Sequence, residues 1–192
     1  MFTNTRVFQY NNNSSQCVYA FDNFLDEDYK NTILNKTIEL TETDSLNHAT
    51  NVKANMTATT ELLKHDEYFL LRGKIATFLN TCIVLRTPHW DEPRDIFFKS
   101  MWGMQHFKGN YTKKHTHGSI DWSGVYYVRS PDSTRISFVD VEYNEAIQEN
   151  SLYIFPGSFQ HFTSRHTSDI SRVSIAFNIV IDWNKSPAFK ND

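Results

Sequence analysis

Apolar and polar residues recur along this chain with two periods, and the period changes near residue 81. In the first half, one apolar stripe predicts a helix over about residues 26–40, with Asp26 as its N-cap. A second stripe predicts a helix over about residues 66–80 that packs on a sheet. The two stripes are formed by Leu25, Tyr29, Ile33 and Thr37, and by Tyr68, Leu71, Ile75, Phe78 and Leu79.

From residue 96 onward the pattern is that of short strands separated by turns. Strands are predicted over residues 96–106, 111–117, 125–129, 134–139, 151–155 and 172–182, and nearer the N-terminus over residues 5–10, 17–21 and 53–63. Short strands at regular spacing are typical of a sandwich or jelly roll. We therefore predict a mostly β protein, a jelly-roll barrel buttressed by two N-terminal helices. The 192 residues predict a single domain, 1–192, with residues 1–94 as support and residues 95–183 as the core.

Composition narrows the function without identifying it. The formal net charge of −3 argues against a broad nucleic-acid surface. The first ten residues lack a long apolar core, so we expect neither a signal peptide nor a membrane span. Two cysteines, Cys17 and Cys82, fit a reducing compartment, and a cytoplasmic location is expected. The oligomeric state is not predicted.

Two histidines separated by one residue give the first candidate site. On an extended chain, His115 and His117 point to the same side and place both imidazoles in one space. Imidazole is the commonest transition-metal ligand at neutral pH, and His161 is the third candidate. Asp121 shares the parity of the pair and is an alternative to His117, since two histidines and one carboxylate are the usual ligands of non-haem iron. The sequence predicts a metal site and leaves this choice open.

The last predicted strand gives the second candidate site. Its odd positions from Val173 to Ile179 are apolar, whereas its even positions hold Arg172, Ser174, Ala176 and Asn178. A guanidinium with a hydroxyl two residues away can bind a carboxylate through two hydrogen bonds. A strand that is polar only on a solvent face would show the same pattern.

Taken together, these blocks resemble the 2-oxoglutarate- and Fe(II)-dependent dioxygenases, in particular a branch found in phages and marine bacteria. The resemblance covers about residues 96–181, and Gly118 replaces the proline that is usual after the two histidines. The matching blocks are Trp102, His115-Thr-His117-Gly-Ser119, Ser123-Gly-Val-Tyr-Tyr-Val128, Phe155-Pro-Gly-Ser-Phe-Gln-His161 and Arg172-Val-Ser-Ile-Ala-Phe-Asn178.

The resemblance implies a double-stranded β-helix with Fe(II) in its mouth, held by His115, His117 and His161. The second ligand is a histidine here, whereas the wider superfamily commonly has an acid at that position. The implied reaction hydroxylates an unidentified protein side chain, prolyl among the options, or a small molecule. It consumes O2 and converts 2-oxoglutarate to succinate, with ascorbate as an optional accessory. For a phage protein, the implied location is the host cytoplasm.

The resemblance also implies a cosubstrate site. Arg172 would pair with the distal carboxylate of 2-oxoglutarate, and Ser174 would hydrogen-bond it. Asn178 and either Tyr126 or Tyr127 are expected to complete the site.

Two other hypotheses are alternatives to the dioxygenase. A cupin-type metal-binding protein would share the barrel and the histidines without using 2-oxoglutarate, and the Arg172-x-Ser174 pattern favours the dioxygenase over it. A non-catalytic jelly roll, such as a virion component, would bind neither metal nor cosubstrate. Aromatic residues expected either at the mouth or in ordinary packing are His89 and Trp90, in the loop 87–93, together with Trp122 and Phe159.

Overall fold

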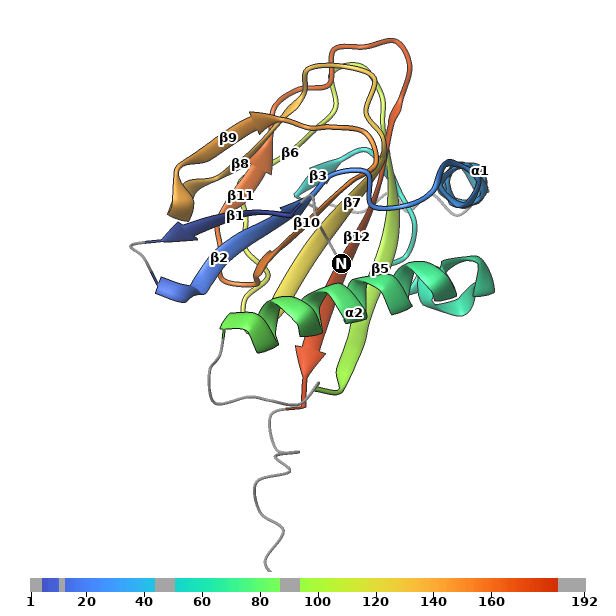
Figure 1. Ribbon diagram of the computed structural model, residues 1–192. Helices are drawn as coiled ribbons and strands as arrows, with labels where there is room; N and C mark the ends of the chain where they lie inside the picture. Colours follow the sequence, from blue (N-terminus) through green and yellow to red (C-terminus); the bar gives the residue numbers. More distant parts are fainter. Residues whose placement is uncertain (1–4, 11–12, 44–50, 87–93, 183–192) are drawn as a thin grey trace, which may run out of the picture.

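A seven-stranded antiparallel sheet forms the centre of the protein (Figure 1). The computed structural model describes residues 5–10, 13–43, 51–86 and 94–182. In spatial order the strands are β1 (Thr5–Tyr10), β2 (Asn13–Phe21), β10 (Ser151–Pro156), β7 (Trp122–Arg129), β12 (Arg172–Ile181), β5 (Ile96–His106) and β4 (Asn55–Met56).

A second, smaller layer of strands lies across one face of this sheet. It contains a three-stranded sheet and a two-stranded sheet, and an isolated bridge between His115 and His161 joins the segment after the two-stranded sheet to the three-stranded one. The strands are β11 (His161–Thr163), β8 (Arg135–Phe138) and β9 (Tyr143–Ala146), and then β3 (Val52–Lys53) and β6 (Tyr111–Thr112). The two layers enclose a barrel interior, so the predicted jelly roll is confirmed.

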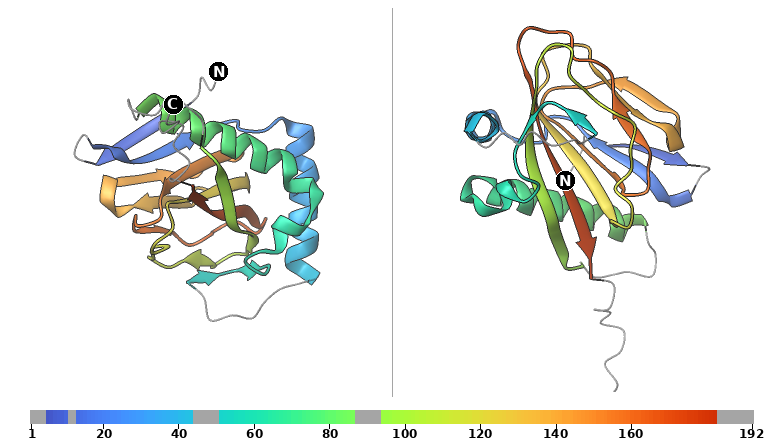
Figure 2. Two further views of the ribbon diagram at one scale, coloured as in Figure 1. Left: turned by 90° about the horizontal axis from the view of Figure 1, so that it is seen from below. Right: turned by 180° about the vertical axis from the view of Figure 1, so that it is seen from behind.

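Two helices cover the other face of the large sheet (Figure 2). They are α1 (Glu27–Thr43) and α2 (Phe69–Arg86), and the short 3-10 segments η1 (Glu61–Lys64) and η2 (Asp66–Tyr68) lead into α2. A third 3-10 segment, η3 (Val139–Val141), joins β8 to β9 in the smaller layer. The predicted cap is present, because Asp26 Oδ1 accepts a hydrogen bond from the Tyr29 amide at 2.9 Å. Neither helix is long and apolar enough, within the part of the chain described, to cross a membrane.

Strand β12 separates the two interiors of the molecule. Its odd residues, from Val173 to Ile179, pack in the main core with α1 and α2. Its even residues Arg172, Ser174 and Ala176 face the barrel and are buried there. The packing behind β12 is tight at Gly124, where an added Cβ would lie 2.2 Å from Phe177 Cζ. Only glycine therefore fits beneath this phenylalanine.

Local structure differs from the predicted elements in three places. Residues 53–63 do not form one strand but two short ones followed by η1. The expected strand over 111–117 ends at Thr112, because the chain leaves the ladder before the two histidines. Strands β9 and β11 were not predicted, since runs of four and three residues carry little periodicity. The loop 87–93, with His89 and Trp90, lies outside the described residues.

Candidate metal centre

Three histidines from two segments meet at the mouth of the barrel. His115 and His161 exchange two backbone hydrogen bonds of 3.1 Å each, which fixes their side chains next to one another. The His117 amide donates to the Gly157 carbonyl at 2.7 Å, so the turn before β11 also holds the second histidine. The structure thus brings the three predicted histidines together, although His117 and His161 are 44 positions apart in the sequence.

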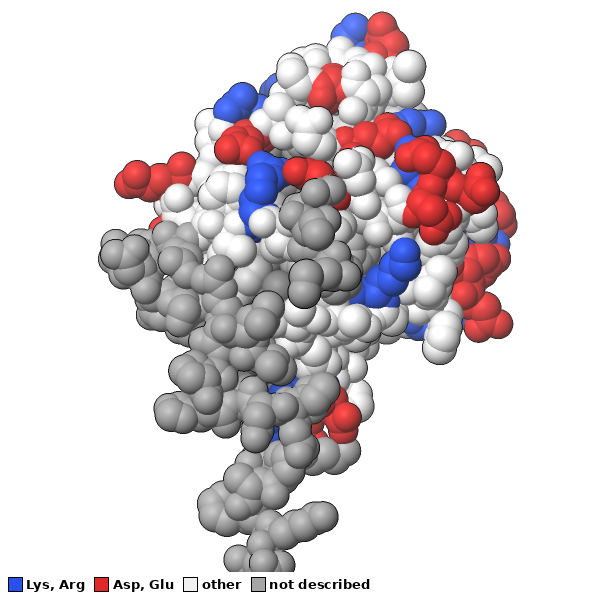
Figure 3. Space-filling view, in the orientation of Figure 1, with Lys and Arg blue, Asp and Glu red and all other residues white. Residues whose placement is uncertain are grey.

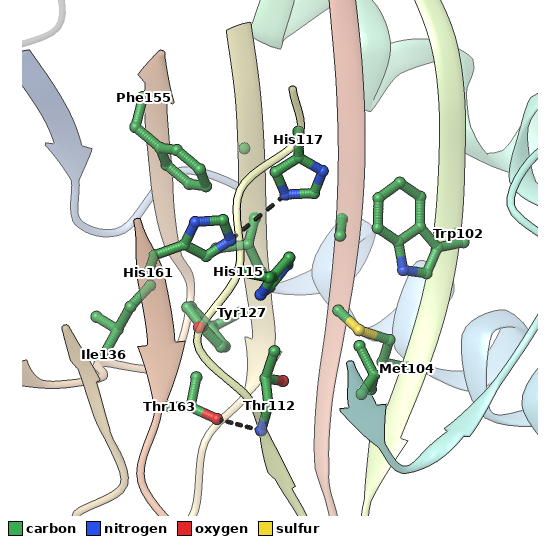
Figure 4. A pocket seen from close by; sticks show the side chains of 14 residues that line it. Trp102, Met104, Thr112, His115, His117, Tyr127, Ile136, Phe155, His161 and Thr163 are labelled. Atoms are coloured by element: carbon green, nitrogen blue, oxygen red, sulfur yellow. Dashed lines mark hydrogen bonds between the residues drawn. The ribbon is translucent and has the colours of Figure 1, made fainter. Parts of the chain in front are cut away.

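The side chains of these histidines point toward a common space (Figure 4). One ligand nitrogen from each ring lies within 4.8 Å of the other two. The Nε2 atoms of His117 and His161 are 3.4 Å apart. Three imidazole nitrogens on one side of a metal ion leave its remaining positions open to other ligands.

Hydrogen bonds to the backbone orient two of the rings. His115 Nδ1 lies 2.8 Å from the Lys113 carbonyl, and His161 Nδ1 lies 3.0 Å from the Phe159 carbonyl. A carbonyl only accepts, so each Nδ1 carries the proton and each Nε2 keeps a free lone pair. These are the tautomers that a metal site needs.

Burial keeps the three rings neutral. Burial, and then the neighbouring His115, lower the pKa of His117 to about 4 and that of His161 to about 3. Burial also lowers the pKa of His115. Neutral imidazoles bind cations without first losing a proton, so the donor set fits a divalent transition metal.

Asp121, the alternative ligand, lies elsewhere. Its Oδ2 accepts a hydrogen bond from the Ile181 amide at 2.9 Å, and it is not part of the histidine cluster. The extended run breaks at Gly118, whose φ is +65°, so the shared parity of Asp121 with the histidines does not persist. Of the two alternatives, the geometry brings His117 to the site.

A cavity of about 50 Å³ leads inward from the histidines between the two layers of strands. Apolar side chains form most of its wall, and Tyr127, Thr112 and Thr163 contribute hydroxyl groups. The Thr163 hydroxyl accepts a hydrogen bond from the Thr112 amide at 3.0 Å (Figure 4).

Arg172 is fully buried and lies behind the wall residues Thr163 and Tyr127 of this cavity. Its Nη2 is 3.5 Å from the Thr163 hydroxyl, and its guanidinium carbon is 6.0 Å from the centre of the Tyr127 ring. Its Nε and Nη1 atoms and the Ser174 hydroxyl have no partner among the described residues. Burial lowers the pKa of Arg172, and a buried unpaired cation costs free energy. These unsatisfied donors are of the kind that bind a carboxylate.

Of the two alternative tyrosines, Tyr126 lies away from the cavity. That residue packs in the core shared with the helices, where its hydroxyl donates to Asn150 Oδ1 at 2.7 Å. Tyr127, on the opposite face of β7, is the tyrosine that reaches the cavity. Asn178 is farther along β12, outside the inner cavity, and its amide group is bonded to Ser100 and Ser123.

His106 lies beside Arg172, whereas the sequence led us to expect a structural or exposed residue rather than a ligand. It is the cross-strand neighbour of Arg172, so their side chains share a face. Its Nε2 lies 3.3 Å from the Thr112 hydroxyl, whereas its buried Nδ1 has no partner among the described residues. Burial, and then the charge of Arg172, lower its pKa well below the ordinary value. The sequence held one indication of this position: His106 and Trp102 are an even number of residues apart on the predicted strand 96–106, so their side chains share a face.

The remaining aromatic candidates are packing residues. Trp122 lies in the helix-side core, and Phe159 lies in the apolar cluster between the small sheet and β10. His166, which we expected from the sequence to be structural or exposed rather than a ligand, contacts the Ile170 carbonyl and the Asp132 carboxylate.

Comparisons with known proteins agree with this geometry at the level of the fold. The sequence matches no protein-family model and no curated protein. The structure is similar to the viral collagen prolyl hydroxylase of Paramecium bursaria Chlorella virus-1, with a TM-score of 0.64 and 12% identity over 84% of this chain and 94% of that one. It is also similar to the α-ketoglutarate-dependent epimerase SnoN of nogalamycin biosynthesis, with a TM-score of 0.67 and 10% identity over 85% of this chain and 77% of that one.

A third similar structure is a prolyl-4-hydroxylase from Pseudomonas putida, with a TM-score of 0.62 and 12% identity over 84% of this chain and 91% of that one. The chain therefore has the double-stranded β-helix fold of the non-haem Fe(II)- and 2-oxoglutarate-dependent oxygenases. Its mouth carries a group of three histidines that can hold a metal ion.

Proposed function

We propose that the protein is an Fe(II)- and 2-oxoglutarate-dependent oxygenase that hydroxylates an organic substrate and releases succinate and carbon dioxide. One observation carries the proposal: the three-histidine cluster lines a small cavity, and Tyr127 and Thr163 of the same cavity wall lie next to the buried Arg172, which has no ion-pair partner among the described residues. A keto acid that chelates a metal at one end needs a carboxylate partner at the other.

The residues have separate roles in this proposal. His115, His117 and His161 would hold Fe(II), which supplies oxygen activation coupled to decarboxylation of 2-oxoglutarate. Arg172 and Ser174 would bind the distal carboxylate of the cosubstrate, because their donors are buried and unpaired.

Three further side chains would shape the cosubstrate site. Tyr127 and Thr163 would line the path of 2-oxoglutarate between the metal and Arg172, and His106 would contribute its Nδ1 beside the guanidinium. The apolar wall would exclude water from the cosubstrate. Ascorbate stays a prediction from the resemblance alone.

We also propose a single domain in which residues 1–94 support residues 95–183. Residues 1–94 would also contribute to the site itself, because Asn51 and Val52 line the outer part of the mouth.

Anaerobic titration tests the proposal directly. Fe(II) and then 2-oxoglutarate are added, and the weak visible charge-transfer band of the complex is recorded. The band is expected in the native protein, absent in His161→Ala and weakened in Arg172→Ala. His65→Ala and Arg72→Ala, which lie in the helical layer, serve as matched controls and are expected to keep it.

The other outcomes assign the protein to different classes. Iron binding without a 2-oxoglutarate band would favour a cupin-type metal protein. Failure to bind any divalent metal would contradict the proposal and favour a structural role.

A further inference from the structure

An outer pocket of about 460 Å³ opens directly onto the histidine cluster. His115, His117 and Trp102 line both this pocket and the inner cavity, so a molecule in the pocket lies next to the metal site. The volume is within the range of pockets that hold small molecules.

A β-bulge brings a cation to the wall of this pocket. In the pairing of β12 with β5, Asn178 lies opposite Ser100, but Ile179 lies opposite Phe98, so Lys99 is an extra residue. Phe98 packs on Phe177 on the helix side at 5.7 Å between ring centres. Lys99 and Ser100 both line the pocket, although strict alternation would put them on opposite faces. The bulge therefore aims Lys99 at the mouth.

The charges around the mouth are of one sign. Lys99 is the only lysine, arginine or carboxylate residue among the described residues that line the pocket. Lys53, Lys113 and Lys114 are exposed on the adjoining β3 and on the segment before His115. No ion pair is found for any of these four lysines within the described ranges.

This local excess contrasts with the chain as a whole, whose formal net charge is −3. Acidic side chains gather instead on the side of the molecule where α1 lies (Figure 3). The mouth is thus a cationic area on an anionic protein, which favours negatively charged ligands.

A buried donor at the floor of the pocket also lacks a partner. Trp102 is 8% exposed, and its ring centre is 6.3 Å from that of His117. Its Nε1–H is buried and finds no acceptor among the residues described. Buried indole N–H groups ordinarily have an acceptor, so an occupant of the mouth is expected to supply one.

We propose that the outer pocket is a substrate site for a small anionic molecule whose carboxylate or phosphate pairs with Lys99. An acceptor oxygen of the same molecule would take the Trp102 indole hydrogen and hold the molecule beside the histidines. This inference rests on the proposed function, because it makes the substrate of that site a small acid rather than a protein side chain.

Matched aromatic probes test the charge preference. Benzoate, phenyl phosphate, the neutral benzamide and the cationic benzamidine are titrated into native protein loaded with Mn(II) and 2-oxoglutarate. Affinity is read from saturation-transfer NMR, and proximity to the metal is read from paramagnetic broadening of the probe protons. At least one anion is expected to bind about tenfold more tightly than benzamide and to be broadened. Comparison of the two anions shows which group the site prefers.

Two variants at Lys99 and one control complete the experiment. Lys99→Gln is expected to remove the preference for the anion, and Lys99→Glu to reverse it in favour of benzamidine. Lys36→Gln, on α1, makes the same change in net charge and is expected to leave the preference unchanged.

Equal binding of benzoate, phenyl phosphate and benzamide, no binding of any of them, or an anion preference that survives Lys99→Gln would overturn the inference. A failure of Mn(II) or 2-oxoglutarate to bind is a separate result, because it refutes the proposed function. The same probes can then be measured by saturation transfer alone on the metal-free protein, where the charge preference still decides for or against the anion site.

Discussion

The two faces of the large sheet differ in the kind of side chain that they bury. The face toward α1 and α2 is closed and apolar, with residues such as Ile175, Phe177 and Leu71 fully buried. The face toward the barrel buries Arg172, Ser174 and His106, each with a polar atom that lacks a partner among the described residues. These side chains are hidden from water on both faces, but those on the barrel face leave polar atoms without a partner.

We therefore expect the helix face to determine stability and the barrel face to determine ligand binding. Apolar burial on the helix face contributes to folding, whereas unpaired polar groups on the barrel face cost free energy until a ligand satisfies them. Proteins tolerate such groups mainly at functional sites. Substitutions on the two faces should therefore change different measurements.

The largest effect on stability is expected from Phe177→Ala on the helix face. Loss of a buried phenylalanine leaves a cavity and should lower the free energy of unfolding by about 3–5 kcal/mol. Urea denaturation measures the change. Metal affinity, measured without denaturant, should stay within about twofold, and a large loss of affinity would show that the faces are not independent.

On the barrel face, Arg172→Leu should act in the opposite way. It removes the charged donors for the cosubstrate carboxylate, so 2-oxoglutarate should bind about 100-fold more weakly to the metal-loaded protein. The free energy of unfolding should stay equal or rise, since a buried unpaired cation is lost. Calorimetric titration and urea denaturation give the two values. A clear loss of stability would mean that Arg172 has a structural partner.

The pH dependence of stability should respond to His106. Its pKa is lowered in the folded state by burial, so the unfolded chain binds its proton first as the pH falls. His106 therefore contributes stability that is present above its unfolded pKa of about 6.5 and is lost below it. His106→Gln should reduce the slope of the free energy of unfolding against pH by up to about 1.4 kcal/mol per pH unit between about pH 6 and 5. An unchanged slope in urea titrations at each pH would contradict a neutral, buried His106.

The smallest effect is expected from Asp121→Ala, which tests the alternative ligand. The change removes the acceptor of the Ile181 amide and should cost about 1 kcal/mol of stability. Metal affinity, followed by isothermal titration, should not change by more than about twofold. A loss of metal binding comparable with that of His161→Ala would return Asp121 to the ligand set.

Much of the fold and of the candidate site was predictable from periodicity. The period of two along residues 172–181 placed Arg172 and Ser174 on the face opposite the apolar core, because side chains of a strand alternate. Helical spacing predicted α1 and α2 for a similar reason. The pair His115 and His117, with His161 after a turn, predicted a common metal site, and the structure brings the three rings together.

The remaining features depended on the tertiary structure. Strand β7 is buried on both faces, so its pattern could not show that Tyr127 rather than Tyr126 reaches the cavity. The position of His106 beside Arg172 and the bulge at Lys99 follow from the register of β5 on β12. Asp121 lies outside the site because the chain turns at Gly118. The sequence by itself determined which residues share a face, because that follows from local periodicity. Which faces meet was decided only by long-range pairing, because contacts between distant segments leave no period in the chain.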